Sequence, residues 1–564
     1  MMSSLYPFVW FYFGAVLVAL SAERWRKGIL LSIPVISGLA LLGVDEGTIV
    51  QFQVMGYTLT PFRADSLSLL FGYLFHIAAF IAILFALHVR DTVQQVTSVA
   101  YAGSALGAVF AGDLITLFIF WELLAVTSVF LIWARRTEKA TRSGMRYLII
   151  QVGSGVLLLA GALLLVHQTG SLIFDKIGLD GSLASWLIFI AFGIKCAFPL
   201  AHNWLTDAYP EATPTGTIFL SAFTTKVAVY ALARAYPGTE ILVYVGATMA
   251  AFPIFYAVIE NDLRRVLAYS MINQIGFMVC GVGIGTALAL NGAVAHAFTD
   301  VIFKGLLMMT MGVVLQQTGR INGSELGGLY KTMPKTTILC IVGAASISAF
   351  PLFSGFVSKS MVMAALLEEG HTTVWLVMLF AAAGVFHHAG IKIPYFAFFA
   401  HDSGIRASDP PLNMMIAMVI GAVLCVGIGS NPSLFYSLLP YDTGYSPYDA
   451  THVLTQLQLL FFSAGAFVWL NLKGLYPPEL PSTNLDMEWL YRRLIPASVR
   501  KVGSPLVTAY QRVSEMSVAA IKAPFNTLSL HHGPRGLLAR TWPTGSMVLW
   551  VAILLGGYLI FYYI

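Results

Sequence analysis

The chain has little charge and little cysteine, and each shortage excludes a class of protein. Only 10% of its 564 residues are charged, whereas soluble domains carry about 25%. The four cysteines (Cys196, Cys280, Cys340 and Cys425) stand singly in apolar segments, so we expect small core residues and no metal or redox pair. The sequence also lacks any flavin, iron–sulfur, quinone or nucleotide signature and any nucleophile constellation, so we expect no cofactor.

Apolar sequence is abundant instead: 58% of the residues are hydrophobic and the mean hydropathy is +0.78. Apolar runs of about 20 residues, enough to cross a ~30 Å hydrocarbon core, recur along nearly the whole chain. The strands of a membrane β-barrel would alternate in polarity, and these runs do not. The sequence predicts an all-α polytopic membrane protein of about sixteen transmembrane helices, over residues 5–20, 28–43, 66–88, 96–111, 113–133, 143–166, 185–205, 214–234, 239–258, 266–284, 288–316, 336–368, 372–400, 411–431, 452–472 and 544–564.

The basic residues give these spans an orientation. Twenty-four of the 32 Lys and Arg residues fall in loops on one side, against Arg63, Lys176 and Arg234 on the other. Because cytoplasmic loops retain positive charge, we expect both termini on the periplasmic side of a bacterial inner membrane. An odd number of spans before residue 473 would scramble this asymmetry, so the even count is favoured. The net charge of +5 is a topology signal and predicts no nucleic-acid partner.

Five lysines and one carboxylate lie inside the apolar stretches: Lys195, Lys226, Lys304, Lys359, Lys392 and Glu122. A charged side chain at the bilayer centre costs ~2.5–3.5 kcal/mol on insertion scales. Such groups mark pathways for ions or protons, and we expect that function here.

Glu122 and Lys195 form the first candidate pair. Buried alone, the carboxyl would hold its proton and the amine would lose one, whereas a pair keeps both groups charged. Moving one charge would then change the proton affinity of the other, so the pair could switch. A static salt bridge that orients helices is the alternative, and the sequence does not decide between the two.

A second titratable group follows. Lys226 precedes His296, Asp300 and Lys304, and the last three are spaced by four residues on one helical face. Such a stripe suits a proton relay, since each transfer has to reach a partner or a bridging water. A satisfied polar seam between helices is the alternative.

Two predicted helices contain breaks beside lysines. In the seventh (AFGIKCAFPLAHNWL), Pro199 follows Lys195 by four residues and removes the hydrogen bond to its carbonyl. In the twelfth (SISAFPLFSGFVSKSMVM), Pro351 and Gly355 precede Lys359. Non-helical backbone at membrane depth lies within protein or along a watery cavity, and paired discontinuous helices mark ion sites in inverted-repeat transporters. Kinks that serve packing alone are the alternative.

Residues 473–543 depart from the pattern. They are polar and proline-rich at first, then long, basic and moderately amphipathic. We expect a helix along the cytoplasmic membrane surface; a disordered linker is the alternative, against which the apolar content argues. Residues 544–564 predict a final anchor span.

In these motifs the chain resembles the antiporter-like subunits shared by respiratory complex I and the Mrp-type multisubunit cation/proton antiporters. The resemblance covers about residues 60–430, through RADSLSLLF, FWELL, KCAFPLAHNWLTDAYPEATPTGTIFLSAFTTKVAVYALAR, ENDLRRVLAYSMINQIGFM, HAFTDVIFKGLLMM and FPLFSGFVSK. The body resembles the D-type subunit of the Mrp antiporters. The amphipathic segment and final span resemble the A-type Mrp subunit and the largest antiporter-like subunit of complex I.

This resemblance implies a division of the chain and a set of roles. The divisions are N-terminal spans at 1–95, inverted five-helix repeats at 96–234 and 239–400, two spans at 411–472, a lateral helix at 473–543 and an anchor at 544–564. The implied roles are a charge-switching pair of Glu122 and Lys195, a connecting Lys226, a central relay of His296 and Lys304, and a proton exit at Lys359.

The chain departs from the family pattern in two places. Asp300 stands where the family usually has a second histidine. A carboxylate there would hold Lys304 protonated more firmly, so the relay would be tuned differently or would carry a cation. Thr206 and Tyr209 stand where proline and histidine often follow the HxWL element that begins at His202.

Lys392, with His387 and His388 beside it, has no role that the resemblance implies. A lysine that snorkels to the cytoplasmic end of its span is as compatible with the sequence as a functional one.

We therefore expect one subunit of a larger membrane complex that moves protons in exchange for, or coupled to, Na⁺ or another monovalent cation. The expected partners are other membrane subunits and the bilayer. The alternative is the proton-pumping arm of a complex I-like redox enzyme or of a CO₂/bicarbonate energy-converting complex, in which the chain would be a translocase subunit. A non-transporting scaffold is a third hypothesis, against which the intact titratable series argues.

Overall fold

A computed structural model describes residues 6–54, 56–481, 484–534, 536, 539–540 and 542–564. The chain divides into two compact units, Met1–Asn484 and Leu485–Ile564. The predicted first span begins at residue 5, which lies outside the described residues.

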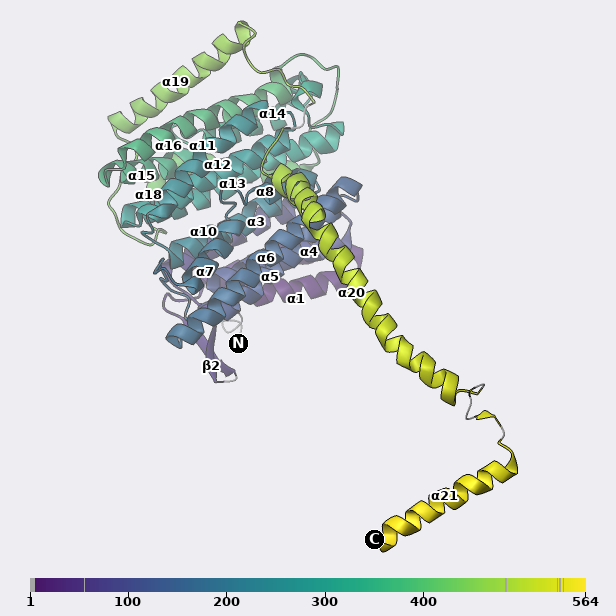
Figure 1. The fold of residues 1–564 in the computed structure, drawn as a ribbon. Helices are drawn as coiled ribbons and strands as arrows, with labels where there is room; N and C mark the ends of the chain where they lie inside the picture. Colours follow the sequence, from purple (N-terminus) through teal and green to yellow (C-terminus); the bar gives the residue numbers. More distant parts are fainter. Residues whose placement is uncertain (1–5, 55, 482–483, 535, 537–538, 541) are drawn as a thin grey trace. The chain divides into compact units, whose positions relative to one another are not determined.

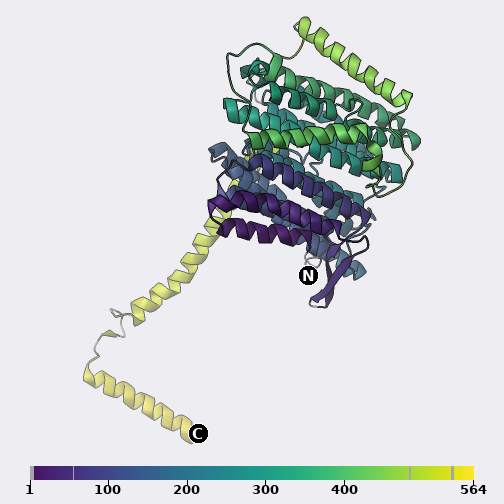
Figure 2. The ribbon, with the colours of Figure 1, turned by 180° about the vertical axis from the view of Figure 1, so that it is seen from behind.

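The first unit contains two groups of helices, coloured purple to blue and teal to green in Figures 1 and 2. The first group comprises α1 (Pro7–Leu20), α2 (Glu23–Leu42), α3 (Ser66–Ala86), α4 (Thr92–Phe110), α5 (Leu114–Trp133), α6 (Glu138–Thr169), α7 (Leu183–Lys195), α8 (Asn203–Ala208), α9 (Gly216–Ala222) and α10 (Thr224–Ala235). The second comprises α11 (Ile241–Ile259), α12 (Leu263–Ile284), α13 (Ala287–Thr318), α14 (Pro334–Ile347), α15 (Ser354–Glu368), α16 (Thr372–Val385), α17 (Leu412–Ser430), α18 (Pro432–Tyr436) and α19 (Ala450–Leu472). Short 3₁₀ segments lie at Tyr209–Glu211, Gly323–Glu325 and Leu329–Lys331, and π-helical segments at Phe386–Lys392 and Tyr395–Phe399.

Each of the sixteen predicted ranges contains a helix. Among the described residues, twelve helices are long and apolar enough to cross a membrane. Three shorter apolar helices, α1, α7 and α14, fall in the first, seventh and twelfth predicted spans, and α4 falls in the fourth. The chain is thus a mostly helical polytopic membrane protein, and the count of sixteen crossings stays a prediction.

The prediction of an all-α fold is wrong in one loop, which holds a β-hairpin. Strands β1 (Ile49–Val54) and β2 (Tyr57–Arg63) pair antiparallel. The backbone N–H of Thr60 donates to Asp113 Oδ2 at 2.6 Å, which ties the hairpin to the start of α5. The sequences IVQFQV and YTLTPFR do alternate in polarity, but the strands are short and lie in a segment read as a connecting loop.

Aspartates begin several helices and so fix their boundaries. The side chains of Asp65, Asp91, Asp113, Asp262 and Asp449 accept hydrogen bonds from backbone N–H groups in the first turn that follows each. These N–H groups have no partner within the helix, so each cap adds about 1 kcal/mol of helix stability.

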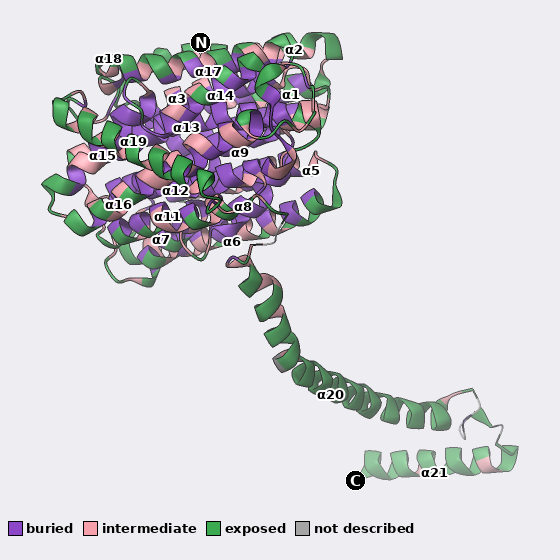
Figure 3. Cartoon of the chain, turned by 90° about the horizontal axis from the view of Figure 1, so that it is seen from above, coloured by how far each residue is buried: buried purple, intermediate pink, exposed green. Residues whose placement is uncertain are grey.

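Helix α13 lies at the core of the first unit. It packs against α12, α14, α15 and α17 of its own group and against α3, α9 and α10 of the other. Every residue from Ala289 to Val314 is buried, and Figure 3 shows the buried residues gathered along the middle helices. A helix buried on all sides is apolar all round, so the polar residues of α13 stand out.

The structure breaks the seventh and twelfth predicted helices, as expected. Residues 196–202 separate α7 from α8, and residues 348–353 separate α14 from α15. Both breaks contain the tetrapeptide Ala-Phe-Pro-Leu, at 197–200 and at 349–352.

The two breaks also share one backbone geometry. Ala197 and Leu200 have φ of 61° and 73°, and Ala349 and Leu352 have φ of 57° and 75°. In each break the phenylalanine N–H donates to the carbonyl five residues back, Phe198 to Gly193 at 2.9 Å and Phe350 to Ala345 at 3.0 Å. A left-handed conformation costs an L-residue about 1–2 kcal/mol, so surrounding packing holds both breaks in place.

The described residues of the second unit form two helices, α20 (Ile495–His532) and α21 (Thr544–Tyr563), with a π-helical turn at Leu490–Leu494. The predicted amphipathic stretch therefore is a helix, although Pro505 and Pro524 lie inside it. The described side chains of both helices are almost all exposed (Figure 3).

Candidate functional site

The charged side chains predicted within the membrane lie in the interior of the first unit. The exposed fraction is 0% for Lys195, Lys226, His296, Asp300, Lys304 and Lys392 and 2% for Lys359, while Glu122 is partly buried. Buried charges need protein partners in place of water. The partner of each group therefore defines what it can do.

Glu122 on α5 and Lys195 at the end of α7 form an open pair. Lys195 Nζ donates to the carbonyl of Trp121, the residue before Glu122, and lies 4.4 Å from the centre of the Trp121 ring. Within the described residues, the buried Oε1 of Glu122 has no hydrogen-bond partner. That oxygen packs against Gly155 on α6, where an added Cβ atom would overlap it.

Lys226 and Asp300 form a closed pair between the two groups of helices. Lys226 Nζ on α10 lies 2.6 Å from Asp300 Oδ2 on α13, and neither side chain is exposed. The same ammonium donates to the carbonyl of Ser221 at 3.1 Å. The sequence predicted that Asp300 lies beside Lys304, but its direct ion pair is with Lys226. The packing of α10 against α13, and not the spacing of residues along α13, decides which ammonium the carboxylate contacts.

Lys304 and His296 are held by uncharged groups. Lys304 Nζ donates to Ser270 Oγ on α12 at 2.9 Å. The His296 ring bonds on both sides, to Gln274 Oε1 at 3.1 Å and to Ser358 Oγ at 2.9 Å. Hydroxyl and amide groups of this kind both donate and accept hydrogen bonds. They can therefore link a donor on one helix to an acceptor on another.

Lys359 lies one residue beyond Ser358 on α15, and its side chain reaches back to the second helix break. Its Nζ donates to the carbonyl of Ile347, the last residue of α14, at 3.1 Å, and lies 5.0 Å from the centre of the Phe277 ring. The break leaves such carbonyls without helical partners. Lys359 therefore caps the broken helix with its charge.

Helix α12 contributes three residues that the sequence motifs did not identify. Ser270, Gln274 and Phe277 touch Lys304, His296 and Lys359 respectively. Their spacing in LAYSMINQIGFM follows one helical face, and Ser and Gln on an apolar span are the signal that could have identified them.

Lys392, His387 and His388 form a separate cluster at the π-helical end of the thirteenth span. Lys392 Nζ lies 2.8 Å from Glu479 Oε1 and donates to the carbonyls of Val258 and Glu260 at 2.6 and 2.7 Å. The ammonium is thus buried and paired and does not reach the surface. Burial raises the pKa of the Glu479 carboxyl, and the Lys392 charge opposes that rise.

Three further histidines complete the predicted positions. The His387 ring packs against Phe467 and Tyr476, and His388 is fully buried. His202 is 2% exposed with its ring 4.7 Å from that of Phe252. In the described part of the chain, no three His, Cys, Asp or Glu side chains come together as metal ligands would.

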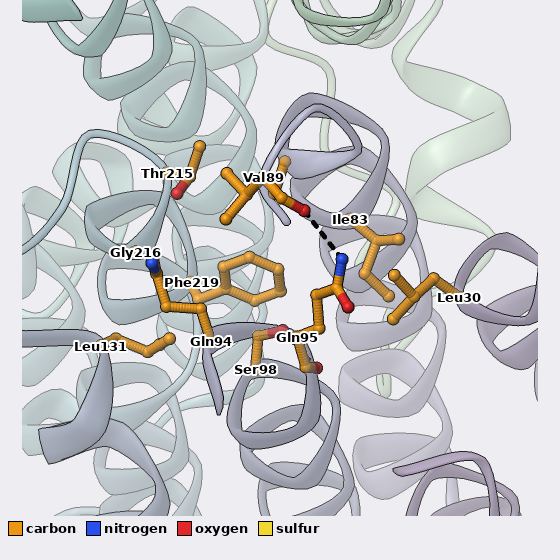
Figure 4. A pocket seen from close by; sticks show the side chains of 11 residues that line it. Leu30, Ile83, Val89, Gln94, Gln95, Ser98, Leu131, Thr215, Gly216 and Phe219 are labelled. Atoms are coloured by element: carbon orange, nitrogen blue, oxygen red, sulfur yellow. Dashed lines mark hydrogen bonds between the residues drawn. The ribbon is translucent and has the colours of Figure 1, made fainter. Parts of the chain in front are cut away.

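Two cavities differ in what lines them. One, of about 20 Å³, lies among α2, α3, α4, α5 and α9 (Figure 4), where the Gln95 amide donates to the Val89 carbonyl at 2.7 Å. None of the buried charged residues lines it. The other, of about 310 Å³, lies among α15, α16 and α19 and has Lys359 in its wall.

Comparison with known proteins shows which membrane proteins this chain is similar to. Residues 111–386 match the family described as "NADH:quinone oxidoreductase/Mrp antiporter, TM". The A-type subunit of the Na(+)/H(+) antiporter of Alkalihalophilus pseudofirmus is 30% identical over 70% of this chain and 55% of its own length. The D-type subunit of the antiporter of the same organism is 28% identical over 60% of this chain and 73% of its own length.

A solved structure shares the fold. A chain of the Mrp complex from Dietzia sp. DQ12-45-1b superimposes with a TM-score of 0.75 at 23% identity, over 92% of this chain and 62% of that one. This chain spans little more than half the length of the A-type relative that it matches. Over residues 111–386, just under half of the chain, the sequence is thus similar to the NADH:quinone oxidoreductase/Mrp antiporter family of membrane proteins.

Proposed function

We propose that this chain is the proton-translocating subunit of a multisubunit monovalent cation/proton antiporter, with Na⁺ as the cation. The observation that carries the proposal is the series of buried titratable side chains, from Lys195 through Lys226 and His296 to Lys359, on helices that pack side by side. A structural core does not need so many charges, since each is expensive to bury. A path for protons does need them.

The contrast between the open and the closed pair supports a switching mechanism. Lys195 is held by a carbonyl, whereas Lys226 is held by a carboxylate. Protonation of Asp300 would neutralise that carboxylate and free the Lys226 ammonium to move. The arrival of one proton at Asp300 would then change the electrostatic environment of the titratable side chains on both sides of the Lys226–Asp300 pair.

From Asp300 the path continues through uncharged groups. Ser270 and Gln274 on α12 hold Lys304 and His296, and Ser358 joins His296 to the turn that bears Lys359. Each group can donate on one side while it accepts on the other. Bridging waters would close the gaps that remain.

We also infer the arrangement of the chain in its complex. The matching Ala-Phe-Pro-Leu breaks support two inverted repeats, over residues 96–234 and 239–400. The distribution of basic residues supports periplasmic termini in a bacterial inner membrane. The exposed helix α20 supports contact of residues 473–543 with neighbouring membrane subunits.

The test measures collapse of a pH gradient in everted vesicles that contain the complete complex, after addition of Na⁺, K⁺ or Li⁺. Glu122→Ala, Lys195→Ala and Lys359→Ala should each abolish exchange and leave assembly intact. Lys335→Ala removes an exposed lysine and should exchange normally. Normal exchange in the Lys195→Ala complex would refute the relay.

The membrane arm of a redox or CO₂/bicarbonate energy-converting complex is the second candidate. The family description, which includes NADH:quinone oxidoreductase, favours keeping it. In that case Lys195→Ala would abolish proton pumping driven by the catalytic partner, while added cations would leave the pH gradient unchanged even in the parent complex.

A further inference from the structure

Lys392 lies outside the proposed relay, and its ammonium is surrounded by oxygen atoms. Its Nζ lies 2.8 Å from Glu479 Oε1 and donates to the carbonyls of Val258 and Glu260 at 2.6 and 2.7 Å. A lysine ammonium has three N–H donors, so there is one oxygen for each of them. We call the two carbonyl oxygens and the Glu479 carboxylate the Lys392 cage.

The cage is built on the end of a helix. Val258 belongs to the last turn of α11, which ends at Ile259, and the backbone of Glu260 is extended. The carbonyls of a last helical turn have no N–H partner within the helix and lie at the negative end of its dipole. In membrane transporters, carbonyls of helix ends and of unwound backbone coordinate Na⁺. The cage therefore contains the ligands that an alkali-metal cation uses.

The cage also contains a carboxylate oxygen that the lysine does not use. The Glu479 side chain is 5% exposed, and within the described residues its Oε2 has no hydrogen-bond partner. A buried polar atom without a partner is uncommon and costs free energy. The charge of the Glu260 carboxylate reaches both Lys392 and Glu479. The site thus has a free ligand atom and a second negative charge beside it.

The Glu260 side chain lies at the solvent side of the cage. Its Oε1 accepts from the N–H groups of Asn261 and Asp262 at 3.0 and 3.1 Å, and its Oε2 accepts from Asn484 Nδ2 at 3.2 Å. Arg265 Nη1 lies 3.9 Å from Oε2, beyond hydrogen-bond distance. Arg265 and Asn484 are both partly exposed. A cation from the aqueous phase would therefore reach the cage past Glu260.

We propose that the Lys392 cage is a binding site for an alkali-metal cation, for which the Lys392 ammonium competes. The ammonium is a compact monovalent cation, and backbone carbonyls replace the hydration shell of an alkali-metal ion in the same way that they solvate this ammonium. One positive charge replaces the other, so the Glu479 carboxylate keeps a counter-charge throughout. The inference rests on the proposed function and assigns a site for Na⁺ to this chain.

The π-helical segment that bears the lysine agrees with such an exchange. Lys392 is the last residue of the segment Phe386–Lys392, and π-helical turns are frequent at functional sites. The cage oxygens belong to other parts of the chain, the end of α11 and the segment after α19. Lys392 can therefore leave the cage without disrupting the backbone that forms it.

The first test removes the competitor and measures binding of ²²Na⁺ to the purified whole complex in choline chloride at constant ionic strength. Lys392→Met should bind ²²Na⁺ at least about tenfold more tightly than the parent, because the ammonium no longer occupies the site. Lys392→Met/Glu479→Gln also removes the carboxylate charge and should lose this gain. Lys335→Met removes an exposed lysine and should bind ²²Na⁺ as the parent does.

The second test compares thermal unfolding in NaCl and in choline chloride at equal ionic strength. In choline chloride the Lys392→Met complex should unfold at a lower temperature than the parent, since the Glu479 carboxylate is then buried without a cation. A cation that binds the folded protein stabilises it, so NaCl should raise the unfolding temperature of Lys392→Met by several degrees. The double variant has no unpaired charge in the cage and should unfold at the same temperature in both salts.

Two results would overturn the proposal and leave a buried salt bridge in its place. One is equal destabilisation of Lys392→Met in both salts with no gain in ²²Na⁺ binding. The other is failure of Lys392→Met to assemble in either salt while the double variant assembles. Neither result affects the proton relay, which the Lys195→Ala assay tests separately.

Discussion

Removal of one partner of the Lys226–Asp300 pair should destabilise the protein, and removal of both should not. The pair joins α10 to α13 at 2.6 Å with neither side chain exposed. Asp300→Leu leaves the ammonium of Lys226 bonded to the carbonyl of Ser221, at 3.1 Å, without a counter-charge. Lys226→Met leaves the carboxylate of Asp300 without its cation.

The size of the effect follows from the complete burial of both groups. Loss of one partner of a buried ion pair costs about 3–5 kcal/mol, because the other charge stays out of water without compensation. Replacement of both partners by apolar side chains of similar volume is close to neutral or stabilising. The double variant Lys226→Met/Asp300→Leu should therefore recover most of what either single variant loses, and a loss of about 3 kcal/mol is roughly a hundredfold in the unfolding equilibrium.

The assay is a double-mutant cycle on the solubilised complex. Equilibrium unfolding in SDS, followed by tryptophan fluorescence, gives the free energy of unfolding for the parent, both single variants and the double variant. The coupling energy of the cycle isolates the pair, since each substitution removes the interaction. The double variant should be folded yet inactive in cation-driven exchange, because its relay has lost the central lysine.

Two results would refute this reasoning. If Asp300→Leu unfolds at the same SDS concentration as the parent, the carboxylate does not compensate the lysine. If the double variant is as unstable as the single ones, the loss comes from packing around α13 and the ion pair contributes nothing specific.

Two further predictions concern contacts outside this pair. Gly155→Ala should displace the Glu122 carboxylate, whose Oε1 the new Cβ atom would overlap, and should slow exchange several-fold with assembly intact. Gly153→Ala on the same helix meets open space and should leave exchange unchanged. Equal rates in the two variants would mean that the position of that carboxylate does not matter. Glu479→Ala should leave a buried lysine unpaired and loosen the segment after α19, so trypsin should cleave the folded complex at Lys473 about tenfold faster than in the parent. Unchanged cleavage would show that the ion pair does not hold this segment.

Local features of the sequence predicted a large part of the fold. Helix length and apolar content depend on neighbouring residues, so the predicted ranges all contain helices. The helix breaks could also be predicted from local sequence, because a proline four residues after Lys195 removes a backbone hydrogen bond wherever the helix lies in the fold. The stripe from His296 to Lys304 followed from helical periodicity alone, and the two residues lie on one helix as expected.

Contacts between distant segments were beyond the reach of such reasoning. The spacing along the helix predicted that Asp300 lies beside Lys304, but α10 packs against α13 and its Lys226 forms the ion pair with Asp300. Lys392 had no visible partner because Glu479 lies in a polar, proline-rich stretch that carries no periodic signal. Helix packing decides which charged side chains form ion pairs. A short stretch of sequence does not contain that information.

The two helix breaks share one backbone geometry, but the lysines beside them differ in their contacts, because different donors bond the carbonyls of each break. In the first break, the indole N–H of Trp204 donates to Ile194 at 2.9 Å, and Lys195 is left to bond the carbonyl of Trp121 beside Glu122. In the second, Lys359 itself donates to Ile347. Deprotonation of Lys195 therefore leaves the first break intact, whereas deprotonation and departure of Lys359 exposes a carbonyl that water or a neighbouring amide has to satisfy. The cavity of about 310 Å³ that Lys359 lines has space for such a water.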